Sequence, residues 1–234
     1  SPVSPMQEVH NAFDVVNPSF ELAYFSFGLR KAQQWRTRMG LPEDEKWAQV
    51  IKYLAPLPQK DSLYLAVAYR PDMWETAYSD TCKNGYGYST HNFLNNPCQN
   101  VDHPSLVGSL GFLDGKNVDK ETMKNTLEKV MDIWDYNRLW GWDFPLLAMT
   151  AAKVDEPELA IDILLMDHPK NSYQENGWMM QGTTITPYLP ANGGLLTAVA
   201  MMAAGWSGDE GTPTPGFPKN GKWSIKYENI SKSL

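Results

Sequence analysis

The sequence predicts a mainly α-helical fold, and three observations support this. Helix-length stretches with apolar residues at helical spacing alternate with segments rich in proline and glycine. Two of these stretches, residues 143–154 and 193–204, are apolar on every face, so each is expected to lie between neighbouring helices. Almost no linker separates 143–154 from the next predicted helix, which indicates an antiparallel pair. Together these features predict a layered α/α architecture.

The individual elements are predicted from caps, periodicity and breakers. Residues 1–16 are punctuated by proline and are expected to form a loop. Asn17 and Pro18 have the residue types of an N-cap and a first helical position, so a helix with a wide apolar face is expected from there to about Arg38. The other expected elements are a helix at 42–54, a short strand at 63–68 in a stretch that is otherwise loop, and helices at 103–113, 119–134, 143–154, 156–167 and 192–205, with Asp119, Asp143 and Asn192 as caps.

The character of the chain changes after residue 206. Residues 207–222 are rich in turn formers, and the alternating Trp223, Ile225 and Tyr227 that follow are typical of a strand. We therefore expect a helical unit at 1–206 and a small C-terminal β appendix at 207–234.

The charge and hydropathy of the 234-residue chain exclude several classes of protein. Asp and Glu outnumber Lys and Arg, 27 to 20, and the net charge of -7 argues against a nucleic-acid partner. No segment reaches the roughly 20 apolar residues that cross a bilayer, so no membrane partner is expected. His91 and His103 complete no recognised metal-ligand spacing. Neither a metal nor a cofactor is expected.

Cys82 and Cys98 are the only cysteines in the sequence, and they bracket a stretch rich in glycine, asparagine and tyrosine. A disulfide that closes this loop would stabilise the fold by about 3 kcal/mol in an oxidising compartment. The alternative is two unpaired thiols. The disulfide hypothesis favours a secreted or periplasmic protein.

Aromatic residues are abundant, with nine Trp, eleven Tyr and eight Phe. An indole ring can cover the apolar face of a pyranose, so many tryptophans are typical of sugar sites, although large helical cores use them as well. Three of them lie close in sequence to a carboxylate: Trp140 and Trp142 near Asp143, and Trp178 near Glu175. These clusters are candidate sugar platforms.

Three carboxylates have the surroundings that glycoside hydrolysis requires, which are a general acid and a second group that activates water or attacks the sugar. They are Glu8 on a loop before a buried helix, Asp143 in LWGWDFP and Glu175 in YQENGW. Each has a plainer alternative: a surface residue for Glu8, an N-cap for Asp143 and a solvated loop residue for Glu175. His10 and His103 are candidate donors to sugar hydroxyls, or else ordinary polar residues.

Residues 1–32, SPVSPMQEVHNAFDVVNPSFELAYFSFGLRKA, resemble the catalytic-acid segment of the six-hairpin glycosidases. Inverting disaccharide phosphorylases carry a similar Gly-Pro-Asp-Glu-Tyr-His stretch, and α-L-fucosidases a similar Ser-Pro-Glu-Asn stretch. Three later segments resemble fucosidase segments in the same order: DHPSLVGSLGFLDGK, LWGWDFPLLAMTAAKVDEPELAIDILL and PYLPANGGLLTAVAMMAAG. The likeness covers most of residues 1–206 and is greatest to bacterial members of unassigned activity.

The resemblance implies that the helical unit is part of an (α/α)6 toroid and that Glu8 is the general acid of a glycoside hydrolase. It implies that the substrate is an oligosaccharide or another glycoside. Asp143 would supply a second catalytic or polar group, and the remaining residues expected to contact the sugar are His10, His103, Trp140, Trp142, Glu175, Trp178 and Asn192.

The sequence departs from the resembled families at the general base. The base aspartate of the fucosidases falls on Pro190, although Asn192 matches the asparagine that follows it. The base would therefore come from Asp143, from elsewhere, or not at all. Phosphorolysis needs no base, but the stretch 183–186 has threonines and no histidine where the phosphorylases have a Ser/His-rich phosphate loop. Hydrolysis is thus the first expectation, phosphorolysis the second, and a non-catalytic carbohydrate-binding or scaffold protein the alternative from another class.

The resemblance also predicts that the ring needs further helices. A closed toroid of this kind has twelve helices, whereas roughly seven are predicted here. The catalytic-acid segment normally lies midway round the ring, but it lies at residue 8 in this chain. We expect the remainder of the toroid to come from the same polypeptide or a second chain, and the 234-residue chain alone to be inactive.

Overall fold

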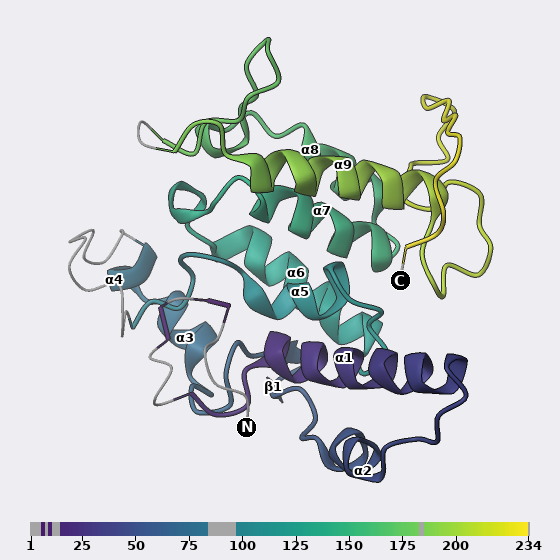
Figure 1. Cartoon of the computed structure of the whole chain (residues 1–234). Helices are drawn as coiled ribbons and strands as arrows, with labels where there is room; N and C mark the ends of the chain where they lie inside the picture. Colours follow the sequence, from purple (N-terminus) through teal and green to yellow (C-terminus); the bar gives the residue numbers. More distant parts are fainter. Residues whose placement is uncertain (1–5, 8, 11–14, 84–96, 183–184, 234) are drawn as a thin grey trace.

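The computed structural model describes residues 6–7, 9–10, 15–83, 97–182 and 185–233. The fold is mainly helical, as predicted. Four helices lie side by side in one row and form one layer of the molecule (Figure 1). In spatial order they are α1 (Ser19–Arg38), α5 (Ser105–Gly111), α7 (Asp143–Lys153) and α9 (Leu189–Ala204).

The four helices of the row run in the same direction. Thr150 donates to the carbonyl of Val107 (3.2 Å), and one turn further along Lys153 donates to that of Leu110 (3.2 Å), so α5 and α7 advance together. Figure 1 shows α1 and α9 in the same direction, with their N-terminal ends on the left of the view. The four N-termini are therefore gathered at one end of the row.

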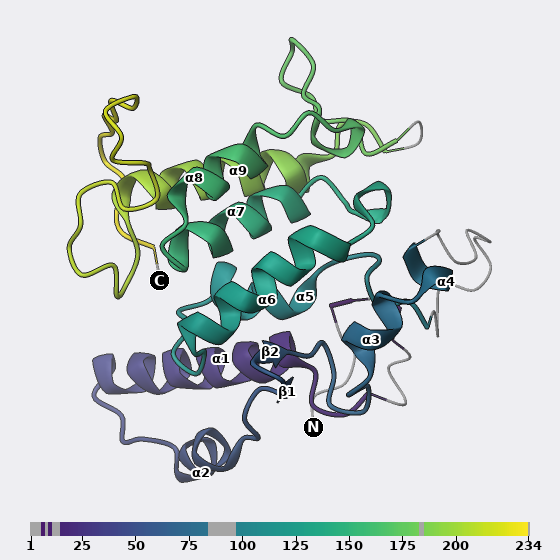
Figure 2. The ribbon, with the colours of Figure 1, turned by 180° about the vertical axis from the view of Figure 1, so that it is seen from behind.

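A second layer packs on this row. Helix α6 (Lys120–Ile133) lies against α5 and α7, α8 (Pro157–Leu164) lies against α7, and α2 (Glu45–Tyr53) lies beside α1 (Figure 2). The short link after α7 reverses the chain through Asp155 in the left-handed region (φ 64°), which confirms the predicted antiparallel pair. Because α7 has neighbours on all sides, each of its residues is buried, as predicted.

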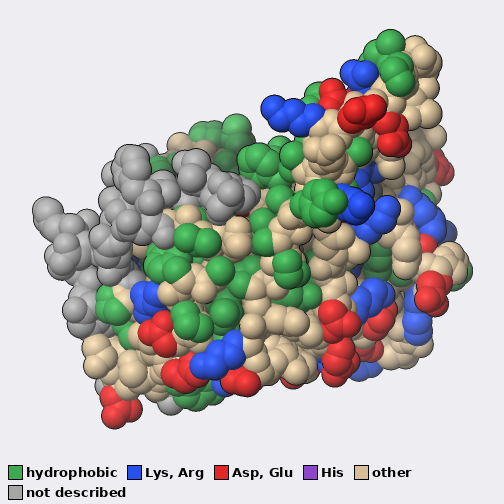
Figure 3. All heavy atoms as spheres, turned by 90° about the horizontal axis from the view of Figure 1, so that it is seen from below, with side chains coloured by type: hydrophobic (Ala, Val, Ile, Leu, Met, Phe, Trp, Pro, Cys, Tyr) green, Lys and Arg blue, Asp and Glu red, His purple; other side chains and the backbone are tan. Residues whose placement is uncertain are grey.

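The two ends of the row differ from its middle. The prediction that α9 is buried on every face is wrong, because Leu189, Leu196 and Val199 are 65%, 72% and 41% exposed. The reason is that α9 packs on α7 with one face only. At the other end, α1 exposes Tyr24 and Phe25. Figure 3 shows the underside of the molecule, where groups of apolar side chains also lie between charged ones.

The predicted strand at 63–68 is shorter in the structure. Only β2 (Leu63–Tyr64) pairs, antiparallel to β1 (Gln59–Lys60). The apolar residues that follow enter the core, and the Ala66 carbonyl accepts from the Ser19 N–H at the start of α1 (2.9 Å). Two short helices, α3 (Met73–Ala77) and α4 (Asp80–Lys83), lie where loop was predicted, and two 3₁₀ turns, η1 (Tyr136–Arg138) and η2 (Pro169–Asn171), complete the described elements.

The predicted β appendix is wrong for the part of the tail that the structure describes. Residues 207–233 contain no strand, only an isolated bridge between Trp206 and Ser233. Asp209 instead organises a turn, in which its carboxylate accepts from the N–H groups of Trp206 and Gly211 (3.1 and 2.9 Å). The apolar alternation of this segment has no second strand to pair with, and Trp223 remains 41% exposed.

None of the helices in the described ranges combines the length and the apolar character that a bilayer crossing requires. This agrees with the hydropathy of the sequence.

Candidate functional site

The N-terminal ends of α5 and α7 bring together a histidine and an aspartate that lie 40 residues apart in the sequence. His103 precedes α5, and its Nδ1 lies 2.9 Å from Oδ1 and 3.2 Å from Oδ2 of Asp143, the first residue of α7. Asp143 is fully buried and His103 is 7% exposed. This His103–Asp143 pair is the centre of the candidate site.

Asp143 does not cap α7 in the predicted way. Trp142 occupies the cap position, and the Asp143 carboxylate accepts from the Trp140 N–H (2.7 Å), which precedes the helix. The N-cap prediction is therefore wrong: the carboxylate closes the loop before α7 and holds His103. Burial raises the pKa of the Asp143 carboxyl, while the hydrogen bonds from His103 and Trp140 oppose that rise.

A second buried acid, Asp102, lies beside the same histidine and was not among the predicted site residues. Its Oδ1 lies 3.5 Å from Nε2 of His103, and the residue is fully buried with its backbone in the left-handed region (φ 61°). The two ring nitrogens of His103 thus face two different carboxylates. An acid next to a histidine in sequence is too common a pattern to have singled out Asp102.

Aromatic rings lie close to His103. The Trp142 ring lies 4.3 Å and the Trp140 ring 6.1 Å from the His103 ring, measured between centroids. Trp142 also stacks on Phe112 (5.6 Å), and Trp140 contacts Tyr188 (5.6 Å). Both tryptophans are half-buried, so each keeps part of its ring accessible. The two predicted platforms therefore lie next to the predicted histidine and aspartate.

The N-terminal segment docks near this group of residues. Gln7 is buried, and its Nε2 donates to the carbonyls of Gln99 (2.9 Å) and Val101 (3.0 Å). Val101 lies two residues before His103. The Met6 N–H donates to the buried Glu21 carboxylate in the first turn of α1. The predicted general acid, Glu8, lies outside the described residues, although the residues on either side of it belong to this docked segment.

His10 is buried at the end of the docked segment. Its Nδ1 lies 3.3 Å from the Tyr69 hydroxyl, and the pair forms an edge-to-face ring contact. Its Nε2 has no hydrogen-bond partner among the described residues. Burial first, and then the positive charge of Arg70, lower the pKa of His10 to about 4. His10 is therefore neutral at physiological pH and can donate or accept only one hydrogen bond at each ring nitrogen.

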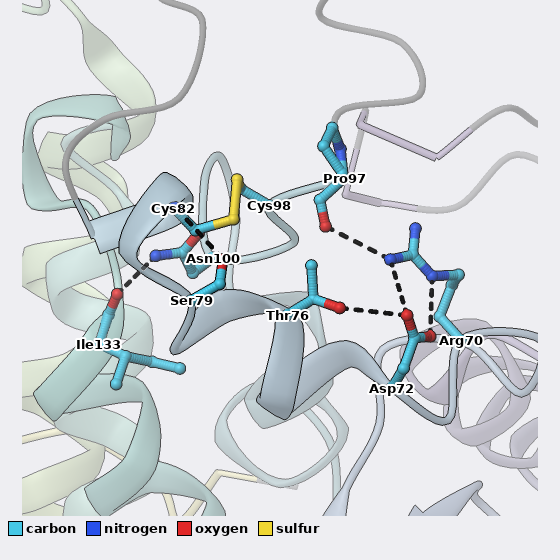
Figure 4. Close-up of a disulfide and its surroundings, with 9 residues drawn as sticks. All are labelled: Arg70, Asp72, Thr76, Ser79, Cys82, Pro97, Cys98, Asn100 and Ile133. Atoms are coloured by element: carbon cyan, nitrogen blue, oxygen red, sulfur yellow. Dashed lines mark hydrogen bonds and ion pairs between the residues drawn. A yellow bond between two sulfur atoms is a disulfide. The ribbon is translucent and has the colours of Figure 1, made fainter.

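The predicted disulfide between Cys82 and Cys98 is present, and it anchors the chain that leads to Asp102 and His103 (Figure 4). Two residues after Cys98, the Asn100 side chain donates to the carbonyl of Ile133 at the end of α6 (2.7 Å). The Asn100 carbonyl accepts from the Asp135 N–H (2.8 Å). The segment before His103 is thus fixed to the second layer.

The other predicted site residues form a separate group at the start of α9. Asn192 is not the N-cap, because α9 begins at Leu189; its Nδ2 instead donates to the Gly177 carbonyl (2.8 Å). This bond ties α9 to the hairpin that carries Glu175 and Trp178, which are both exposed. None of the described contacts joins Glu175 or Trp178 to the His103–Asp143 pair, so the structure does not bring all predicted residues together.

Comparisons with known proteins identify no relative. No family model, no curated protein and no solved structure matches the chain.

Proposed function

We propose that the N-terminal ends of the four-helix row form the sugar-binding centre of a glycoside hydrolase. The observation that carries this proposal is the contact of a buried histidine–aspartate pair with two half-buried tryptophans. Indole faces bind the apolar side of a sugar ring and the indole N–H can donate to its hydroxyls, while His103, whose two ring nitrogens face Asp143 and Asp102, supports the two rings. Oligosaccharides and other glycosides offer both surfaces at once.

In this proposal Asp143 acts through His103. Its carboxylate is enclosed and already accepts two donors, so its role is to hold the ring of His103 beside Trp140 and Trp142. Glu8 is the proposed general acid because the sequence around it resembles the catalytic-acid segment of the six-hairpin glycosidases. We prefer hydrolysis to phosphorolysis because residues 183–186 contain threonines but no histidine, whereas the phosphorylases have a Ser/His-rich phosphate loop at this place. The disulfide supports secretion or a periplasmic location.

We further propose that the row is part of an (α/α)6 toroid. Four parallel helices, with α8 antiparallel to α7 on the outside, fit the inner and outer layers expected of such a ring, and the two end helices keep apolar faces open. Further helices, from the same polypeptide or a second chain, would cover α1 and α9. Light scattering on the 234-residue chain tests this; self-association is expected, since soluble monomers rarely expose such faces. A catalytically competent monomer of 26.4 kDa would contradict it.

The activity itself is tested by release of reducing sugar from a glycan panel, using the assembled ring once its other helices are known. Glu8→Gln is expected to lower turnover by about 10²–10⁴-fold, because it removes general acid catalysis. Glu228→Gln, an exposed glutamate of the tail, is the matched control and should keep wild-type turnover. Equal turnover of the two variants would refute the role of Glu8. Saccharide binding without cleavage would favour a non-catalytic binding protein. The proline at position 190 supports this alternative, because it stands where the fucosidases have their general base.

A further inference from the structure

A hollow of about 330 Å³ lies beside Trp140 and joins the candidate site to a pair of cations. Trp140 belongs to both places, since its ring contacts His103 and also lines the hollow. Further lining residues come from three segments of the sequence: Asn137, Arg138, Lys170, Gln181 and Ile185.

The walls of the hollow are held by hydrogen bonds. The turns η1 and η2 lie in contact and carry Arg138 and Lys170 respectively. Gln181 connects the opposite wall, because its Oε1 accepts from the Gly141 N–H (2.7 Å) and its Nε2 donates to the Leu139 carbonyl (3.3 Å). Lys170 Nζ donates to the carbonyl of the same Gln181 (3.2 Å). Lys170 is therefore held in place by the Gln181 backbone, and Gln181 in turn by its side-chain bonds to Leu139 and Gly141.

Of the residues that the structure describes, two cationic ones and no carboxylate line this hollow. Lys170 takes part in none of the ion pairs within the described ranges. Burial and then the nearby guanidinium of Arg138 both lower the pKa of the Lys170 ammonium. Two like charges close together in a partly enclosed space repel each other, and a bound anion would relieve that repulsion.

A second hollow on the same molecule offers a contrast. It has a similar volume, about 340 Å³, and is also lined by an arginine and a lysine, Arg30 and Lys116. There the arginine is neutralised, because its Nη2 donates to both oxygens of Asp114 (2.6 and 2.8 Å). Glu43 lines that hollow as well. The absence of a lining carboxylate thus distinguishes the hollow beside Trp140.

We propose that the hollow beside Trp140 binds an oxyanion next to a sugar ring, with Lys170 and Arg138 as its ligands and Trp140 as the adjoining platform. The anion would be the carboxylate of an acidic sugar or a phosphate group. This inference deepens the proposed function and rests on it only for the sugar; the anion-binding part stands on the hollow and its two cations.

Isothermal titration calorimetry with three small probes tests the proposal: D-glucuronate, inorganic phosphate and D-glucose. D-Glucuronate or phosphate should bind more tightly than D-glucose, and added salt should weaken the binding. Lys170→Gln should weaken it about tenfold, as expected for loss of a charged hydrogen bond. The Lys170→Gln/Arg138→Gln double variant should abolish it. Lys116→Gln, the same substitution in the contrasting hollow, should bind as the wild type does.

The outcomes separate the sources of the anion and the two proposals. Preference for D-glucuronate identifies an acidic sugar, and preference for phosphate identifies a phosphate group. Equal binding of D-glucose and both anions, or anion binding of wild-type affinity in a folded Lys170→Gln variant, overturns the anion site and leaves the sugar site intact. Lys170→Gln changes a half-buried surface residue, so its fold is readily checked by circular dichroism. Anion binding in a chain that binds no saccharide supports the anion site and counts against the proposed function.

Discussion

The Asp143 carboxylate satisfies two buried donors that come from different segments, the His103 ring and the Trp140 N–H. Its removal would leave both without an acceptor in a place that water does not reach. Asp143→Ala should therefore lower the free energy of unfolding by about 3 kcal/mol or more. Asp143→Asn keeps one acceptor oxygen and should cost about 1–2 kcal/mol.

Urea unfolding of the two Asp143 variants measures this difference, with Asp119→Ala as the matched control. Asp119 caps α6 by accepting from the Thr122 N–H (2.8 Å), as the sequence predicts, and it is exposed, so its loss should cost only about 1 kcal/mol. If Asp143→Ala costs no more than Asp119→Ala, then Asp143 is an ordinary helix-start residue.

His10 makes the stability of the protein depend on pH. Its folded pKa of about 4 lies below the ordinary value of 6.5, so the unfolded chain binds more protons between these values. The free energy of unfolding should therefore be highest above pH 6.5 and fall by roughly 3 kcal/mol as the pH drops to 4. His10→Asn should flatten this part of the profile. Urea titrations from pH 4 to 7 check it, and parallel profiles of variant and wild type would contradict a buried neutral His10.

Single residues of the site were only partly predictable. The neighbouring tryptophans direct attention to Asp143, and its place at the start of a predicted helix directs attention to His103. The hydrogen bond between Asp143 and His103 depends on the parallel packing of α5 and α7, which no local sequence pattern predicts. The same is true of Asp102, whose importance comes from its burial beside His103.

At the scale of elements, α5 and α7 are joined by a buried lysine. Lys153 is 2% exposed, and its Nζ donates to the carbonyls of Leu110 and Leu113 at the C-terminal end of α5 (3.2 and 2.9 Å). Burial lowers its pKa to about 8, although Asp114 acts in the opposite direction. The charged side chain of Lys153, on the otherwise apolar α7, thus supplies hydrogen-bond donors to carbonyls at the C-terminal end of α5.

Lys153→Met should destabilise the protein by about 1–3 kcal/mol at pH 7, because it leaves two buried carbonyls without a donor. The pH dependence has a defined sign. Since the folded pKa of about 8 lies below 10.5, the unfolded chain binds the extra proton between these values, and wild-type stability should rise from pH 8 to 10.5. Lys153→Met should lose this rise. Thermal unfolding at pH 7, 8 and 10 measures both effects; a rise of the same size in the variant would rule out Lys153 as its source.

Long elements with clear periodicity were predictable, and short ones were not. The predictions for α1, α6 and α7 agree with the structure apart from their ends, because each is a long stretch with clear helical periodicity; of the three predicted caps only Asp119 of α6 is observed. Helices α3 and α4 contain too few residues to show a helical period. The tail misled the prediction because alternation alone is typical of a strand, whereas a strand also needs a partner.

At the scale of the whole molecule, the row of parallel helices explains both the site and the exposed faces. Parallel packing gathers the N-terminal ends and their loops at one side (Figure 1), and there His103 and Asp143 meet beside two tryptophans. The same packing leaves α1 and α9 with one uncovered side each. The sequence predicted two-layer packing from α7, but it could not show which helices lie at the ends, because that order depends on tertiary contacts.

The most direct test of the account is saccharide binding by the 234-residue chain on a glycan microarray. Trp142→Ala should reduce binding about tenfold, since the contact with the indole removes apolar sugar surface from water at roughly 25 cal/mol per Å². Trp142→Phe keeps the stack on Phe112 and should retain part of the signal. Trp223→Ala removes an exposed tryptophan of the tail and is the matched control. The account predicts that wild type and Trp223→Ala bind the same glycans and that Trp142→Ala does not; an array with no bound glycan, or binding that is unchanged in folded Trp142→Ala, would contradict it.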